Sequence, residues 1–114
     1  ALKEVLPVIK PGIRERDIAI ELEYQMRKLG GDGVSFTTIV ASGLRGATPH
    51  ATASSKKIKL GTFITMDFGT YYKRYASDMT RTVALGKVAK EIRRIYQVVH
   101  SAQMLGVDAV REGI

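Results

Sequence analysis

The most informative segment of this chain is Phe63-Ile-Thr-Met-Asp-Phe-Gly-Thr-Tyr-Tyr-Lys-Arg-Tyr-Ala-Ser-Asp-Met-Thr-Arg-Thr-Val-Ala-Leu85. Its β-branched and aromatic residues predict a hairpin whose strands cover residues 62–71 and 75–85. Each strand carries an aspartate, Asp67 in the first and Asp78 in the second, although aspartate is depleted in strands. Two such exceptions in one hairpin suggest a common cause.

The pairing of the two strands determines whether these aspartates meet. With a turn centred on Tyr72-Lys73, we expect Asp67 to lie opposite Asp78 and Thr65 opposite Thr80. Because these two turn residues include no Gly or Asn, we expect a longer loop that keeps the same register. Side chains alternate between the faces of a strand, so one face of the hairpin is predicted to be polar. This polar face would consist of Thr65, Asp67, Asp78, Thr80 and Thr82.

Two opposed carboxylates repel each other unless something relieves their charge. A shared proton is one solution, and a solvated face with two tolerated aspartates is another. A divalent cation such as Mg²⁺ or Mn²⁺ is the interpretation we favour, because hard cations prefer oxygen ligands. Two carboxylates are too few for a tight site, so further ligands would have to come from elsewhere.

The remaining residues predict helices around this hairpin and one further strand. Apolar residues recur at helical spacing before and after the hairpin, which indicates helices with one buried face each. The predicted elements are helices over 1–9, 14–29 and 88–110, a strand over 35–41 and a loop over 43–57. The residues expected to face the core are Ile18, Leu22, Met26 and Leu29 in the second helix and Val88, Ile92, Ile95, Tyr96 and Val99 in the last. This order predicts an α+β fold with helices on one face of a mainly antiparallel sheet.

Composition excludes several classes of protein. The 114 residues fit one domain and contain no cysteine, so disulfides, thiolate metal sites and a cysteine nucleophile are excluded. No apolar run reaches the ~18 residues of a membrane span, and we expect a cytoplasmic protein without a membrane partner. The net charge of +7 is spread along the chain rather than concentrated. Nucleic-acid binding is therefore not favoured, although a steep loss of affinity with salt would reveal it.

Two short segments near the ends of the chain are alike. Val8-Ile-Lys-Pro-Gly-Ile13 is echoed by Ala109-Val-Arg-Glu-Gly-Ile114. If the echo marks an internal repeat, a second copy of the unit would begin where this chain ends. A functional site at the interface of two such units would then be only partly contained in one unit.

The quoted hairpin resembles the metal-binding hairpin of the pita-bread metallopeptidases. Met66-Asp-Phe-Gly-Thr-Tyr-Tyr72 and Tyr75-Ala-Ser-Asp-Met-Thr-Arg-Thr82 carry the resemblance. Ser35-Phe-Thr-Thr-Ile-Val-Ala-Ser-Gly43 and Thr48-Pro-His50 are similar to the branch that contains the Xaa-Pro dipeptidases (prolidases) and aminopeptidases P. The similarity runs along nearly the whole chain, so residues 1–114 look like the amino-terminal half of a pita-bread catalytic domain. The second half and the amino-terminal domain of prolidases would lie outside it.

The resemblance implies roles for four residues. Asp67 would bind one metal of a dinuclear site, Asp78 would bridge both metals, His50 would hold the substrate or the tetrahedral intermediate, and Thr80 would support Asp78. The ions would be Mn²⁺, Co²⁺ or Zn²⁺, with Mn²⁺ favoured, and the substrate a peptide with proline in second position. A histidine and two glutamates from the second half would complete the site. The parent protein would then be a homodimeric hydrolase, whereas this chain alone is expected to be inactive and to self-associate.

Two other readings of the same residues remain open. The chain could be half of a methionine aminopeptidase, although those enzymes lack the Ser35–Gly43 pattern. It could also be a non-catalytic pita-bread relative that binds peptides or proteins, but such relatives typically lose the metal ligands, and both aspartates are present here.

Overall fold

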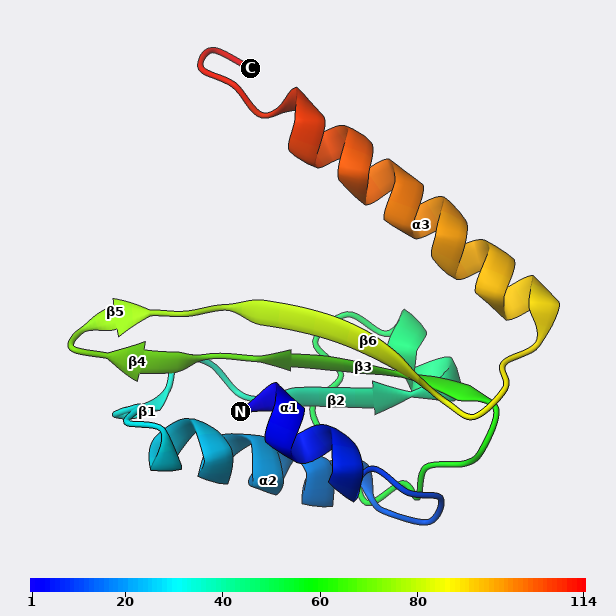
Figure 1. The fold of residues 1–114 in the computed structure, drawn as a ribbon, viewed down its shortest axis with the longest axis horizontal. Coiled ribbons are helices and arrows are strands. Elements are labelled where there is room, and N and C mark those ends of the chain that lie inside the picture. The colour runs from blue at the N-terminus through cyan, green and yellow to red at the C-terminus, as the bar shows by residue number, and fades with distance from the viewer.

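The computed structural model describes all 114 residues and shows a long hairpin at the centre of the fold (Figure 1). Strand β3 (Thr62–Phe68) pairs antiparallel with β6 (Met79–Leu85) on one side and with β2 (Ile39–Ser42) on the other. The two arms continue as β4 (Thr70–Tyr72) and β5 (Tyr75–Ala76), which form a second sheet with β1 (Gly33–Val34). The predicted antiparallel sheet is confirmed, although β2 begins at Ile39 rather than at residue 35.

The hairpin register differs from the prediction by two residues. Tyr72 pairs with Tyr75, so the turn is the two-residue Lys73-Arg74 and not a longer loop. Both turn residues have positive φ, 47° and 71°, a left-handed geometry that suits the twist of a hairpin but that sequence rules assign to Gly or Asn. Asp67 therefore lies opposite Thr80 rather than opposite Asp78.

The polar face of the hairpin survives this shift. An even shift keeps every side chain on its own face of the sheet. Thr65 now lies opposite Thr82, and their hydroxyl oxygens are 3.3 Å apart. The other face of β3 carries Ile64, Met66 and Phe68, all of which are buried.

That apolar face packs against the amino-terminal helices. Helix α2 (Glu15–Lys28) lies under the sheet beside α1 (Leu2–Val5) and the 3₁₀ turn η1 (Leu6–Val8) (Figure 1). The predicted stripe on α2 is confirmed at three positions, whereas Leu29 follows the helix and is 67% exposed. The core consists of Val5, Ile18, Ala19, Leu22, Met26, Val40, Ile58, Ile64, Met66 and Phe68.

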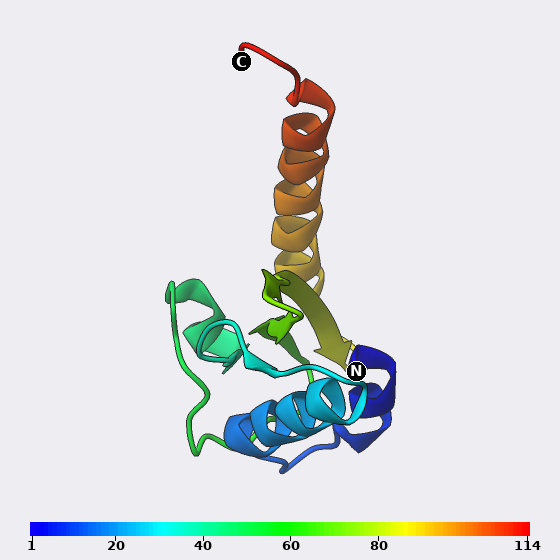
Figure 2. The ribbon, with the colours of Figure 1, turned by 90° about the vertical axis from the view of Figure 1, so that its left-hand side faces the viewer.

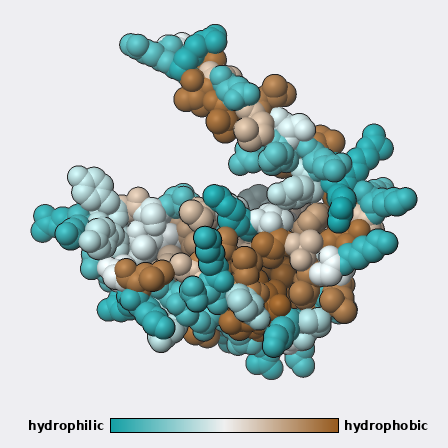
Figure 3. All heavy atoms as spheres, viewed as in Figure 1, coloured by the Kyte–Doolittle hydropathy of each residue, from teal (hydrophilic) through white to brown (hydrophobic).

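The last helix, α3 (Lys90–Ala109), projects away from the rest of the fold (Figures 1 and 2). The prediction that its apolar face packs on this core is wrong. Ile92, Ile95, Tyr96 and Val99 are exposed, and only Val88, which precedes the helix, is buried. Apolar side chains accordingly lie uncovered along the projecting helix in Figure 3. An amphipathic pattern shows that a helix face is suited to burial but does not specify what covers it.

The loop predicted over residues 43–57 contains one short 3₁₀ turn, η2 (Gly43–Ala47), and otherwise lacks regular structure. The structure contains no helix with the length and apolar character of a membrane span.

Candidate active site

The polar face of the hairpin borders a hollow of about 500 Å³, and three of the predicted site residues line it. Its walls come from β2 and the segment before it, from the loop after η2, from β3 and from the residue before β6. The lining residues are Phe36, Thr37, Ile39, His50, Thr52, Asp67 and Asp78. The structure therefore brings His50 to the two aspartates, although its place in the loop could not be derived from periodicity.

Asp67 lies on the central strand of the sheet, between Ile39 on β2 and Thr80 on β6. Its Oδ1 atom is buried and has no hydrogen-bond partner. A buried carboxylate oxygen without a partner is costly, and a bound cation would satisfy it. The environment of Asp67 therefore fits a metal ligand.

Asp78 is exposed and directly precedes β6. Continuing the register places it opposite Gly69 and hence on the same face as Asp67, as its diagonal neighbour. Such neighbours are ~7–8 Å apart in antiparallel pairs, a spacing that leaves room for ions between the carboxylates. Ser77 fixes the backbone here, because its N–H donates to the Thr70 carbonyl at 2.9 Å and its carbonyl accepts from Ser35 Oγ at 2.8 Å.

Gly69 explains why the motif reads Asp67-Phe68-Gly69. A Cβ atom at this position would collide with the Ser77 carbonyl oxygen and would lie 2.5 Å from Ser35 Oγ and 2.8 Å from Phe36 Cε1. The φ angle of Gly69 is not among the positive ones, so the requirement is steric rather than conformational. The missing side chain lets Phe36 approach the hairpin and form one wall of the hollow.

The site contained in this chain is sparse in ligands. No group of three or more His, Asp or Glu side chains is close enough to hold a metal ion. Thr80 lies directly opposite Asp67, and its carbonyl accepts a hydrogen bond from Arg81 Nη1 at 2.7 Å. His50 is exposed and adopts a positive φ of 57°. Further ligands would have to come from outside the described residues, as the sequence predicts.

Sequence reasoning did not single out Glu15, the first residue of α2. Its side chain is fully buried, and Oε2 accepts hydrogen bonds from Ser42 N at 2.7 Å and Ser42 Oγ at 2.9 Å. Oε1 accepts from Arg45 Nε at 2.9 Å, Ser54 Oγ at 2.6 Å and Ser54 N at 3.3 Å. Burial by itself would raise the pKa of this carboxyl, but the bonds from Ser54 and Ser42 outweigh it and hold the pKa below its ordinary value of 4.5.

The sequence signal that could have identified Glu15 is weak. Glu15 lies in the segment Arg14-Glu15-Arg16-Asp17, in which every residue is charged and is suited to the solvated first turn of a helix. Only the tertiary structure shows which of these side chains points inward.

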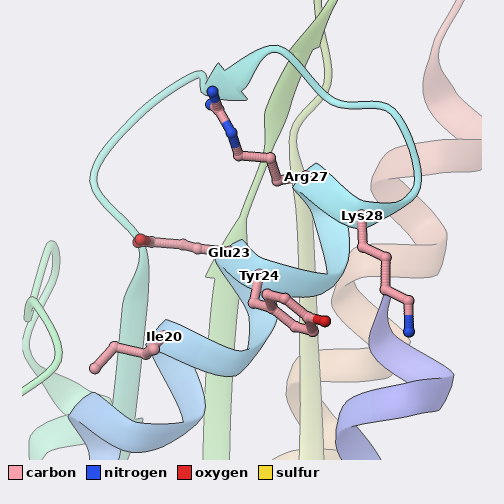
Figure 4. A pocket seen from close by; sticks show the side chains of 5 residues that line it. All are labelled: Ile20, Glu23, Tyr24, Arg27 and Lys28. Carbon is pink, nitrogen blue, oxygen red and sulfur yellow. The ribbon is translucent and has the colours of Figure 1, made fainter.

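A second hollow, of about 550 Å³, lies on the outer surface of α2. All five side chains that line it come from this one helix, as Figure 4 shows: Ile20, Glu23, Tyr24, Arg27 and Lys28. It contains none of the predicted site residues, and no second element contributes a converging polar group. We therefore place the candidate site at the hairpin.

The helix-backed antiparallel sheet has the arrangement that the resemblance to the pita-bread metallopeptidases implies, and the two aspartates and the histidine lie beside one hollow of it. The chain belongs to metallopeptidase family M24, whose family model matches residues 1–114. Membership implies divalent metal ions in the complete protein.

Sequence similarity to curated peptidases supports this assignment. The chain is 40% identical over 114 residues to an Xaa-Pro dipeptidase of Pyrococcus furiosus and spans 33% of it. It is 51% identical to the uncharacterized peptidase YqhT of Bacillus subtilis and spans 32% of it. The chain therefore covers about a third of the length of these curated relatives.

Solved structures show the same likeness. An Xaa-Pro dipeptidase from Bacillus anthracis superposes with a TM-score of 0.96 at 47% identity, over 99% of this chain and 32% of that one. A variant of Escherichia coli aminopeptidase P in complex with substrate gives a TM-score of 0.83 at 30% identity, over 90% and 23% of the two chains.

Proposed function

We propose that the protein containing this chain is a dinuclear-metal Xaa-Pro dipeptidase or aminopeptidase that hydrolyses the bond before proline. The observation that carries the proposal is the hollow in which Asp67, Asp78 and His50 meet. Relatives with 40% and 38% identity that are named Xaa-Pro dipeptidase support the choice of substrate.

Asp67 and Asp78 would hold the ions with their carboxylates, and the unpartnered Oδ1 of Asp67 supports this assignment. The chemistry supplied by two bound divalent ions is the activation of water and the polarisation of the scissile carbonyl. His50, at the rim of the hollow, would bind the substrate or the tetrahedral species, and Thr80 would support the neighbouring Asp78. Phe36 and Ile39 provide an apolar wall in the same hollow.

We further propose that residues 1–114 form the amino-terminal half of a pita-bread catalytic domain, with the remaining ligands on the other half. The presence of only two carboxylates at the hollow supports this division. Mn²⁺ is the ion we favour, a homodimer the assembly and the cytoplasm the location. A peptide with proline in second position would be the substrate.

Metal binding is tested by calorimetric titration of Mn²⁺ into the 114-residue chain at physiological salt. We expect weak binding that Asp67→Asn abolishes, because two carboxylates form only part of a site. The matched control is Asp108→Asn, an exposed aspartate on α3. Equal binding by the Asp67 and Asp108 variants would contradict the assignment.

Activity is tested in the full-length protein with Xaa-Pro dipeptides and Mn²⁺. The metals supply several kcal/mol of transition-state stabilisation, so Asp78→Asn should lower kcat/KM by at least ~10³-fold. Asp108→Asn should leave it unchanged. Binding of Xaa-Pro peptides without hydrolysis would favour the non-catalytic relative, and cleavage after an initial methionine would favour a methionine aminopeptidase.

A further inference from the structure

The loop between β2 and the Ser54 region carries two residues of the hollow, His50 and Thr52. Few interactions inside the loop hold it in place. The Thr48 N–H donates to the Arg45 carbonyl at 3.0 Å, the Ala51 N–H donates to the Thr48 carbonyl at 3.4 Å, and Ala51 is the buried residue within the loop. Thr52 touches the sheet through one isolated bridge to Ile39. The position of His50 therefore depends on how the ends of this loop are anchored.

Both ends of the loop are anchored on one carboxylate. Glu15 accepts hydrogen bonds from Ser42 at the start of the loop and from Ser54 at its end, two residues that are twelve positions apart. Backbone bonds reinforce the second anchor, because the N–H groups of Arg16 and Glu15 donate to the carbonyls of Ser54 and Lys56 at 3.0 Å each. The first turn of α2 therefore holds both ends of the segment 42–54 by hydrogen bonds.

Arg45 extends this anchor toward the hollow. Its Nε forms an ion pair with Glu15 Oε1 at 2.9 Å, and its Nη2 donates to the Thr52 carbonyl. Thr52 and His50 line the same hollow, so the guanidinium connects the buried carboxylate to the segment that faces the aspartates. Charge-assisted bonds of this kind are directional and stronger than neutral ones.

We propose that Glu15 is a positioning residue that, through Ser42, Arg45 and Ser54, holds the loop so that His50 faces Asp67 and Asp78. This inference rests on the proposed function, since it assigns the loop a task in that reaction. Glu15 itself does not line the hollow and touches neither aspartate. Its loss should displace the loop without removing the metal ligands.

The first experiment is independent of activity and compares hydrogen exchange in the full-length protein and in Glu15→Gln. We expect amides of residues 43–54 to exchange at least about tenfold faster, because the lost bonds to a charged group held that segment closed. Amides in β3 and β6 should be unaffected. Glu21→Gln is the control, since Glu21 also lies on α2 and accepts a hydrogen bond, but from Gln25 within the same helix. Uniform acceleration over the whole domain would show a role in global stability and overturn the proposal.

The second experiment measures Xaa-Pro hydrolysis and metal content in the same variants. A displacement of about 1 Å in a group that contacts substrate costs up to ~10²-fold in rate, so Glu15→Gln should lower kcat by about 10- to 100-fold. Metal content should stay at the level of the unmodified protein. Unchanged kcat in folded Glu15→Gln, or a loss of activity that merely follows a loss of metal, would overturn the proposal.

Ser54→Ala covers the case in which Glu15→Gln does not fold. It removes one of the bonds to the carboxylate and should produce smaller changes in the same two measurements, whereas no change in either would count against the proposal. Different results would refute the proposed peptidase function and the proposed role of Glu15. An unmodified protein that does not cleave Xaa-Pro peptides would refute the proposed function, while the exchange experiment would still decide whether Glu15 holds the loop.

Discussion

Gly69→Ala tests the claim that the Asp67-Phe68-Gly69 motif is required for packing between the hairpin and the wall of the hollow. The added Cβ would collide with the Ser77 carbonyl oxygen and would lie 2.8 Å from Phe36 Cε1. The carbonyl belongs to the backbone and accepts from Ser35 Oγ at 2.8 Å, so it cannot move without disturbing that bond. The substitution should therefore open the hairpin at the point where Asp78 is positioned.

The expected cost follows from these contacts. Overpacking of a well-packed site costs ~1–3 kcal/mol, and one or two weakened hydrogen bonds add ~0.5–1.5 kcal/mol each. We therefore expect the free energy of unfolding to fall by about 1.5–6 kcal/mol, a large share of the ~5–15 kcal/mol of a typical domain. Because φ at Gly69 is not positive, backbone strain adds nothing to this figure.

Urea unfolding of the chain, followed by circular dichroism, measures this loss as a lower midpoint at constant slope. Gly106→Ala is the matched control, because a Cβ at Gly106 meets nothing within 4 Å and the residue lies within α3. Alanine there should stabilise the helix by ~0.5–1 kcal/mol. An unchanged or raised midpoint for Gly69→Ala would refute the steric argument.

Three further predictions concern other parts of the fold. Arg74→Gly should raise the free energy of unfolding by ~1 kcal/mol, because φ of 71° strains a residue with a Cβ; a lower urea midpoint would contradict this. The Glu15 pKa is depressed in the folded state, so its contribution to stability is present above pH 4.5 and is lost as the pH falls through the folded-state value. Urea midpoints between pH 7 and pH 3 should therefore fall less steeply in Glu15→Gln, and parallel curves would refute the assignment. Because α3 exposes Ile95 and Val99 at 59% and 62%, the chain should self-associate in sedimentation. Val99→Glu should weaken that association, and a monomeric unmodified chain would contradict it.

The fold class and the faces of the hairpin could be predicted because they depend on local periodicity. Side chains in a strand alternate with period two, so any even shift of register leaves Asp67 and Asp78 on the same face. The helical stripe on α2 likewise follows from spacing alone. These features survive errors in the turn, as the shift to Lys73-Arg74 demonstrates.

The tertiary structure decided what periodicity does not encode. Which residues oppose each other depends on the turn, and Lys73-Arg74 accepts a left-handed geometry that its residue types disfavour. The burial of Glu15 depends on donors that are 27 to 39 positions away in the chain. Amphipathic spacing predicted burial for α3, yet Ile92, Ile95 and Val99 are exposed, and Tyr96 stacks on Phe63 at 5.2 Å between ring centroids. In each case the stabilising free energy comes from contacts between segments that are distant in sequence. A periodic pattern identifies the side chains suited to burial but does not show which residues they contact.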